Sequence, residues 1–132
     1  MAEHNVVGKE GEEIAKRYLE NKGYAIVEQN YRTKRAEIDI IARLRLGFWG
    51  LGGSILVFVE VRTKHHEQYG SPEETITYWK RLRLKRNAAA YIHRTKYRGP
   101  WRIDAVCIVI DQNTGLLKRI SHYESIVETP LH

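Results

Sequence analysis

Cysteine is almost absent from this sequence of 132 residues, which contains only Cys107. A single thiol excludes an internal disulfide and is typical of a protein in a reducing cytosol. Because Cys107 lies in the apolar run AVCIVI, we interpret it as a buried packing residue.

Long apolar segments and targeting signals are also missing. The longest apolar stretch, LGFWGLGGSILVFV, is rich in glycine and shorter than the roughly 18–20 residues that a membrane span requires. No cationic and apolar leader precedes the first helical pattern, so we expect no secretion. These absences predict a cytoplasmic protein without a membrane partner.

Internal repeats, linkers and low-complexity tracts are absent as well. The length and the hydrophobic content of 42% predict one domain over residues 1–132, built around a single core. The 22 Lys and Arg side chains exceed the 16 Asp and Glu side chains and give a formal net charge of +6. This excess favours a polyanionic partner, nucleic acid before a membrane surface.

Hydrophobic periodicity and turn residues predict the order of the secondary structure. Helices are expected over 7–23, 75–94 and 124–128, and strands over 24–30, 37–42, 56–64, 101–110 and 116–123. Ser71 and Glu74 form a candidate capping box before the second helix. Strands two and three follow each other without a helix and predict an antiparallel hairpin. The order α-β-β-β-α-β-β predicts an α/β fold, with a central mixed five-stranded sheet flanked by helices.

Three carboxylates lie where these patterns favour apolar side chains. Glu12 lies on a helical stripe that borders the core-facing one, and Asp39 lies inside the strand EIDIIA. The third, Glu60, lies inside LVFVEVRTK, where period-two spacing places it on one face with Arg62 and Lys64. Judged alone, Glu60 with Arg62 also fits an ion pair on a solvated sheet face, and Glu12 fits an ordinary surface acid.

The two strand acids together indicate a metal site. In EIDIIA, spacing places Glu37, Asp39 and Ile41 on one face. Two buried acids on neighbouring strands repel each other and need a cation between them. Carboxylate oxygens suit Mg²⁺, which polarises a phosphoryl oxygen and lowers the pKa of a bound water. Arg62 would lie beside such an ion and stabilise negative charge on a phosphate. We expect Mg²⁺, with Mn²⁺ as an alternative.

EIDIIA followed by FVEVR resembles the acidic and E-x-K motifs of PD-(D/E)xK nucleases. The wider pattern is similar to the YraN-like family, small bacterial proteins that resemble Holliday-junction resolvases. The matching segments occur in the family's order and span nearly the whole chain: AKRYLENKGY, AEIDIIA, VFVEVR, YGSPEETIT and RIDAVCI. The resemblance implies a restriction-endonuclease-like fold and a Mg²⁺-dependent DNA endonuclease that acts on branched or damaged DNA. It also implies a homodimer, with the apolar segment GFWGLGG as a candidate interface.

The resemblance further implies roles for single residues. Asp39 and Glu60 would bind the metal with the carbonyl of Val61, and Glu12 would support the metal or its water. Arg62 stands at the position of the nuclease lysine. The candidate nucleic-acid-binding residues are Lys64, Lys80, Arg81 and Arg83, with DNA preferred over RNA as the partner. Alternatively, Lys80, Arg81 and Arg83 lie on a solvated face of the second predicted helix and contact no phosphate.

Arg62 is the main departure from the nuclease pattern. Arginine clamps phosphate in two places but stays protonated, so it cannot serve as a base. If the lysine only holds charge against the phosphate, Arg62 suffices. If it transfers a proton, the chain is instead a non-catalytic nucleic-acid-binding protein on a nuclease fold. We interpret Trp79 and Trp101 as core or rim packing residues rather than base-stacking residues.

Overall fold

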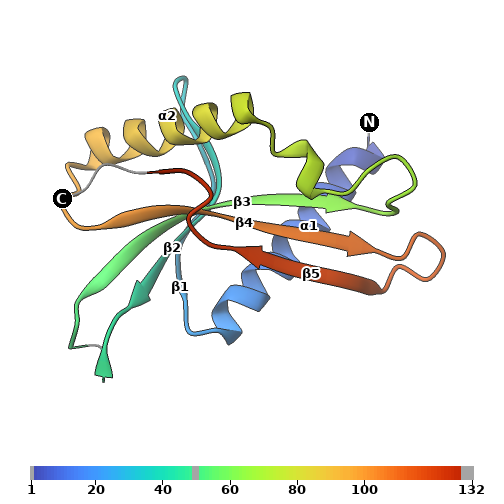
Figure 1. Ribbon diagram of the computed structural model, residues 1–132, viewed down its shortest axis with the longest axis horizontal. Helices are drawn as coiled ribbons and strands as arrows, with labels where there is room; N and C mark the ends of the chain where they lie inside the picture. Colours follow the sequence, from blue (N-terminus) through green and yellow to red (C-terminus); the bar gives the residue numbers. More distant parts are fainter. Residues whose placement is uncertain (1, 49–50, 129–132) are drawn as a thin grey trace.

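The computed structural model describes residues 2–48 and 51–128 (Figure 1). Its helical elements are α1 (Ala2–Asn21), the short 3-10 helix η2 (Glu73–Thr75) and α2 (Tyr78–Thr95). Its strands are β1 (Ala25–Arg32), β2 (Glu37–Arg45), β3 (Ser54–Lys64), β4 (Trp101–Ile110) and β5 (Leu117–Tyr123). Among these residues, no helix combines the length and the apolar composition that crossing a membrane requires.

The five strands form one mixed sheet in the order β1-β2-β3-β4-β5. Neighbouring strands pair antiparallel except β3 and β4, which are parallel and are joined through α2. Parallel neighbours need such a crossover, because a tight turn joins only antiparallel strands and the chain must first return to the other end of the sheet. The predicted α/β class, the order of helices and strands along the chain, the mixed five-stranded sheet and the β2–β3 hairpin are therefore confirmed.

The helices pack on opposite faces of the sheet, so the core is divided in two, whereas the sequence predicted a single core. Strands buried on both faces need apolar side chains in both directions. The side chains under α2 and those under α1 form separate clusters. The α2 cluster contains Tyr31, Ala36, Ile38, Ile41, Leu56, Phe58, Leu84, Ala88, Tyr91, Trp101 and Ile103. The α1 cluster contains Ala15, Leu19, Tyr24, Ile40, Ala42, Val57, Val59, Val106, Ile108 and Ile110.

A buried glycine sets the distance between α1 and the sheet. A Cβ atom at Gly11 would overlap the Oγ1 atom of Thr63 on β3. Only glycine lets the backbone of α1 lie this close to the Thr63 side chain. The next residue, Glu12, is thereby held beside the end of β3.

The predicted start of the second helix is wrong. The second helix begins at Tyr78 and not at 75, because Thr77 provides the N-cap and its Oγ1 accepts the N–H of Lys80 at 3.1 Å. The Ser71 cap does form, with Oγ accepting the N–H of Glu74 at 3.3 Å, but it precedes η2.

The expected last helix over 124–128 does not form. Ser125 has a φ of 53° and donates its N–H to Asp104, while Ile126 donates its N–H to the carbonyl of Ile103. These contacts fasten the segment to the sheet, and five residues are too few to sustain a helix against them.

The side-chain alternation predicted for the second strand is also wrong. Ile38 and Ile41 pack under α2, whereas Ile40 and Ala42 pack under α1. The register with β3 runs only from Arg45↔Ser54 to Ile40↔Val59, although pairing with β1 continues to Glu37. The strand turns away from β3 at this point, which breaks the period of two around Asp39.

Candidate active site

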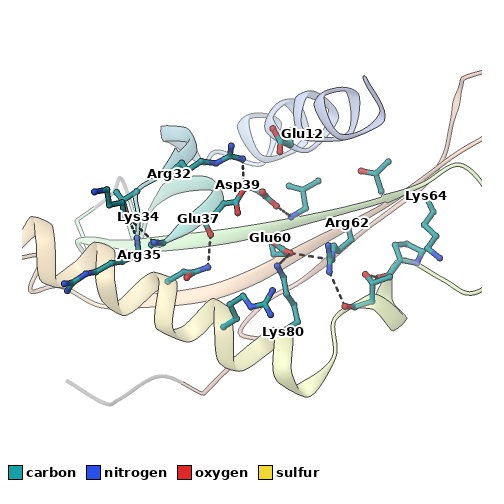
Figure 2. A pocket seen from close by; sticks show the side chains of 18 residues that line it. Glu12, Arg32, Lys34, Arg35, Glu37, Asp39, Glu60, Arg62, Lys64 and Lys80 are labelled. Carbon is teal, nitrogen blue, oxygen red and sulfur yellow. Dashed lines mark hydrogen bonds and ion pairs between the residues drawn. The ribbon is translucent and has the colours of Figure 1, made fainter. Parts of the chain in front are cut away.

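A cleft of about 660 Å³ opens where β2 and β3 diverge, between α1 and α2 (Figure 2). It is lined by every predicted site residue except Arg81: Glu12, Asp39, Glu60, Val61, Arg62, Lys64, Lys80 and Arg83. Arg81 is exposed elsewhere on α2. The structure therefore brings together residues from four elements that are far apart in the sequence.

Asp39 occupies the gap that the diverging strands leave. Its Oδ2 accepts the backbone N–H of Val61 at 2.9 Å, so a side chain takes the place of a ladder partner. The N–H and C=O of one strand residue point to the same side. The carbonyl of Val61 therefore lies on the same edge of β3 as the Asp39 carboxylate.

Asp39 and Glu60 are close enough to perturb each other. Burial raises the pKa of Asp39 to about 8, and the charge of Glu60 and a hydrogen bond with it add to the rise, while the Val61 N–H opposes it. Asp39 thus holds a proton at neutral pH in the protein alone. A cation that replaces this proton would stabilise the two carboxylates, because it offsets the repulsion between their charges.

Glu60 is buried, with 6% of its side chain exposed, which overturns the alternative of an ion pair on a solvated face. Its Oε2 lies 3.1 Å from Nζ of Lys80 and 3.5 Å from Nε of Arg62. The second of these is longer than a normal hydrogen bond. As predicted, Glu60 and Arg62 share the β3 face of Phe58, which α2 covers.

The guanidinium of Arg62 retains donor capacity. One terminal nitrogen donates to the carbonyl of Thr75 at 3.3 Å. Its Nε atom is buried without a hydrogen-bond partner in the part of the chain that the structure describes. The Glu60 carboxylate lies 3.5 Å from this atom, so the two side chains form an ion pair rather than a hydrogen bond.

Glu12 enters the cleft from α1, across the divergent strands from Lys80 (Figure 2). Burial raises its pKa, a hydrogen bond with Asn30 opposes this, and the charge of Glu60 adds to the rise. The sequence alternative of an ordinary surface acid is therefore wrong. Three carboxylates influence one another at this site.

Two parts of the cleft were not predicted from the sequence. The end of β1 contributes Arg32 and the turn after it contributes Lys34 and Arg35, while α2 contributes Asn87. The amide of Asn87 donates to the carbonyl of Glu37 at 2.9 Å and ties α2 to β2. Three cations in RTKR were a detectable signal, but a polar turn between strands has the same local pattern.

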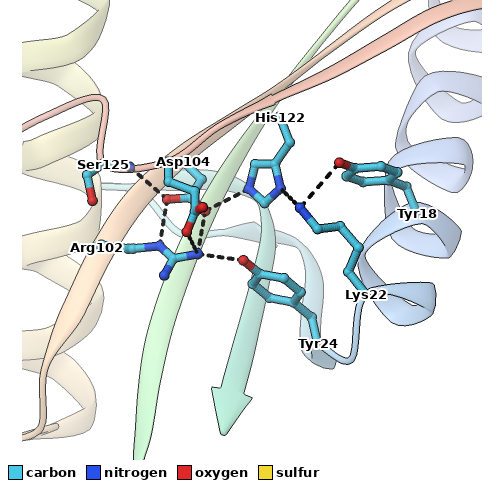
Figure 3. A network of polar contacts seen from close by, with 8 residues as sticks. Tyr18, Lys22, Tyr24, Arg102, Asp104, His122 and Ser125 are labelled. Atoms are coloured by element: carbon cyan, nitrogen blue, oxygen red, sulfur yellow. Dashed lines mark hydrogen bonds and ion pairs between the residues drawn. The ribbon is translucent and has the colours of Figure 1, made fainter. Parts of the chain in front are cut away.

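A second polar network, outside the cleft, centres on Asp104 of β4 (Figure 3). This carboxylate is fully buried and lies 2.8 Å from Nε2 of His122 and 2.9 Å from Nε of Arg102. Burial raises its pKa, but the hydrogen bonds from His122 and Arg102 outweigh burial and hold the pKa below its usual value. Nζ of Lys22 lies 3.1 Å from Nδ1 of His122, and Arg102 also contacts Tyr24, so the network joins β4 and β5 to the end of α1.

The mixed five-stranded sheet and the element order α-β-β-β-α-β-β make this an α/β domain and are consistent with a nuclease-like fold. The chain matches the profile of a protein family described as "Uncharacterised protein family UPF0102" over residues 11–108. It belongs to this family, which confirms the resemblance to the YraN-like proteins.

Individual relatives are similar over most of their length. The UPF0102 protein of Thermodesulfovibrio yellowstonii is 40% identical over 102 residues, which cover 77% of this chain and 84% of the relative. The UPF0102 protein of Alkaliphilus metalliredigens is 47% identical over 88 residues, 67% of this chain and 70% of the relative. The UPF0102 protein of Phocaeicola vulgatus is 34% identical over 120 residues, 91% and 93% of the two chains.

Replacing Asp39 with Asn should stabilise the metal-free protein at alkaline pH. Folding raises the pKa of Asp39 from 3.8 to about 8, so the folded state binds this proton more tightly than the unfolded state. Stability should fall as pH rises from about 4 to about 8, and the loss is complete above the folded pKa. Asn keeps the bond to Val61 without the charge.

We expect Asp39→Asn to raise the free energy of unfolding by about 1–2 kcal/mol at pH 8.5 and by much less at pH 4. Denaturant titration in EDTA measures this, with Glu13→Gln on the exposed side of α1 as the control. A variant that is less stable than the wild type at pH 8.5 would contradict the proposed repulsion.

Proposed function

We propose that this protein is a divalent-metal-dependent endonuclease that hydrolyses phosphodiester bonds in DNA. The observation that supports it most is the pairing of Asp39 with Glu60 beside Arg62 in one cleft. Like charges at close range are costly, and a hard cation relieves the cost.

Asp39, Glu60 and the Val61 carbonyl would hold Mg²⁺ or Mn²⁺. Among the described residues, no three acidic, His or Cys side chains form a complete cage for a metal ion. Mg²⁺ needs no such cage, since it usually takes one or two carboxylates and keeps water and substrate phosphate as its other ligands. When bound, the ion supplies an activated water and neutralises charge on the phosphate.

The remaining cleft residues position these groups. Lys80 and Arg62 contact Glu60 and hold its carboxylate in place. Arg62 places a positive charge in the cleft beside the phosphate, and Glu12 is placed to orient a water. The contacts of Lys80 and Arg62 fix the position of the Glu60 carboxylate before a ligand binds, as a preorganised site requires.

The charge of the cleft favours a nucleic-acid substrate. Seven cations line it: Arg32, Lys34, Arg35, Arg62, Lys64, Lys80 and Arg83. Four acids line it: Glu12, Glu37, Asp39 and Glu60. In Figure 2, Arg32, Lys34 and Arg35 lie at one end of the cleft and Lys80 lies beside Glu60. Positive charge is thus spread along the cleft, which suits a nucleic-acid backbone that crosses it.

A homodimer would bring two such clefts to two strands of one DNA. The hairpin beyond Arg45 leaves Phe48 and Leu51 exposed over 84% and 86% of their surfaces. These side chains belong to GFWGLGG, the segment expected as the interface, of which residues 49–50 lie outside the described residues.

The test is a cleavage assay on end-labelled duplex, nicked, flap and four-way DNA, with matched RNA, in Mg²⁺, Mn²⁺ or EDTA. We expect metal-dependent cuts in at least one DNA structure and weaker cutting of RNA. Intact substrates in both metals across the whole panel would contradict the proposal.

Arg62 favours a second candidate function, nucleic-acid binding without cleavage, because it already pairs with Glu60 and cannot accept a proton. If Arg62 acts as a fixed charge, Arg62→Lys should keep cleavage within about tenfold, and Arg62→Ala should lower it about 10²–10³-fold. Single-turnover cleavage rates measure this. A wild type that binds without cutting, beside an Arg62→Lys variant that cuts, would support the binding function instead.

A further inference from the structure

Of the two tryptophans interpreted as core or rim packing residues, Trp101 packs in the core and Trp79 does not. The side chain of Trp79 is 73% exposed and that of its neighbour Tyr78 is 59% exposed. Their ring centroids lie 5.3 Å apart with an interplanar angle of 76°, an edge-to-face contact that orients the indole. A large exposed aromatic pair of this kind on a helix calls for a ligand.

The pair lies in the first turn of α2, next in sequence to residues that line the cleft, although neither ring is itself among the lining residues. Trp79 immediately precedes Lys80, which contacts the candidate metal ligand Glu60. Helical spacing places Trp79 on the same stripe as Arg83, four residues on, and Arg83 lines the cleft. Arg86 continues that stripe one turn further.

The charge around the pair identifies the chemistry of its partner. The helix from Tyr78 to Thr95 contains no acidic residue. Within nine residues of its start it contains five cations: Lys80, Arg81, Arg83, Lys85 and Arg86. An apolar protein surface would remove these charges from water without offering opposite charges. A second copy of the same helix would bring like charges close together. A polyanion with flat aromatic faces satisfies both the cations and the rings.

We propose that Trp79 stacks on an unpaired base beside the scissile phosphate, so that the substrate is nucleic acid with single-stranded nucleotides at the cleft. This inference rests on the proposed function of the same cleft. In an intact duplex, neighbouring base pairs cover the base faces, so an indole gains little there. A tail, a flap or an open branch point exposes them.

The experiment measures affinity by fluorescence anisotropy in EDTA, where metal-dependent cutting cannot occur. The probes are a blunt duplex and the same duplex with a single-stranded tail. The proteins are the wild type, Trp79→Ala, Trp79→Phe and, as a matched aromatic control, Tyr69→Ala, whose side chain is 80% exposed and lies outside the cationic helix α2.

Trp79→Ala should weaken binding of the tailed duplex about ten- to a hundredfold and change binding of the blunt duplex less than about twofold. Trp79→Phe should recover most of the loss, and Tyr69→Ala should bind like the wild type. Equal affinities for all proteins, or equal losses on both probes, would overturn the inference. A Trp79→Ala variant with a lower molar mass than the wild type by light scattering, but with the same affinity for the probes, would also overturn the inference. The ring would then be a contact between copies of the chain.

The outcome is independent of catalysis. Because no metal is present, Trp79 can fail this test while cleavage in Mg²⁺ persists. Cleavage can equally be absent while Trp79 still discriminates between the tailed and the blunt probe. The two proposals can therefore fail separately.

Discussion

Asp39→Asn and Glu60→Gln should each lower metal-dependent DNA cleavage by about 10³-fold or more. Both changes keep the shape of the side chain and remove one negative charge from the pair that would bind the cation. Glu60→Gln also weakens the contacts that hold Lys80 and Arg62 in the cleft. Single-turnover rates at saturating Mg²⁺ measure the loss.

Glu13→Gln is the matched control, because Glu13 neighbours Glu12 on α1 but pairs with Arg17 on an exposed face. Its cleavage rate should stay within about twofold of the wild type, as expected for a surface pair. Unfolding does not explain a loss in Asp39→Asn, since this variant should be the more stable protein at alkaline pH. Undiminished cleavage by both cleft variants would place the active site elsewhere.

Asp104→Ala should have the largest effect on stability, a loss of about 3–5 kcal/mol in the free energy of unfolding. The fully buried carboxylate holds Arg102, His122 and the N–H of Ser125. Its removal leaves a mostly buried guanidinium without its main partner. It also releases the C-terminal segment, which Ser125 anchors to the sheet. Denaturant unfolding followed by circular dichroism measures the change.

Glu124→Ala separates the buried network from its exposed edge. Glu124 contacts the same guanidinium at 2.9 Å, but 57% of its side chain is exposed. We expect this variant to lose no more than about 1 kcal/mol. If Asp104→Ala cost as little as Glu124→Ala, the network would not be the structural link between β4, β5 and α1.

The two acids of the cleft could be predicted because their apolar neighbours are unusual surroundings for a carboxylate. Asp39 stands between isoleucines and Glu60 between valines, so burial followed from the strand patterns alone. The strand order followed in the same way from hydrophobic runs and the residues between them. These signals are local, so they can be recognised in the sequence without knowledge of the tertiary contacts.

The features that could not be predicted depend on tertiary geometry. The divergence of β2 from β3 inverts the faces of Ile38 and Ile40, and no residue between them marks the turn. The cations of RTKR face the cleft because β1 and β2 continue past the end of the β2–β3 ladder. Exposure of Trp79 likewise depends on where Thr77 starts α2, which a second capping signal at Ser71 obscured.

Mn²⁺ soaked into crystals of this protein tests the proposed site most directly, because the ion is located by its anomalous scattering. We expect one strong peak between the carboxylates of Asp39 and Glu60, within bonding distance of the Val61 carbonyl oxygen, and no peak there in Asp39→Asn crystals. A cleft without a peak at saturating Mn²⁺, with Lys80 and Arg62 still on Glu60, would contradict a metal-dependent active site in this fold.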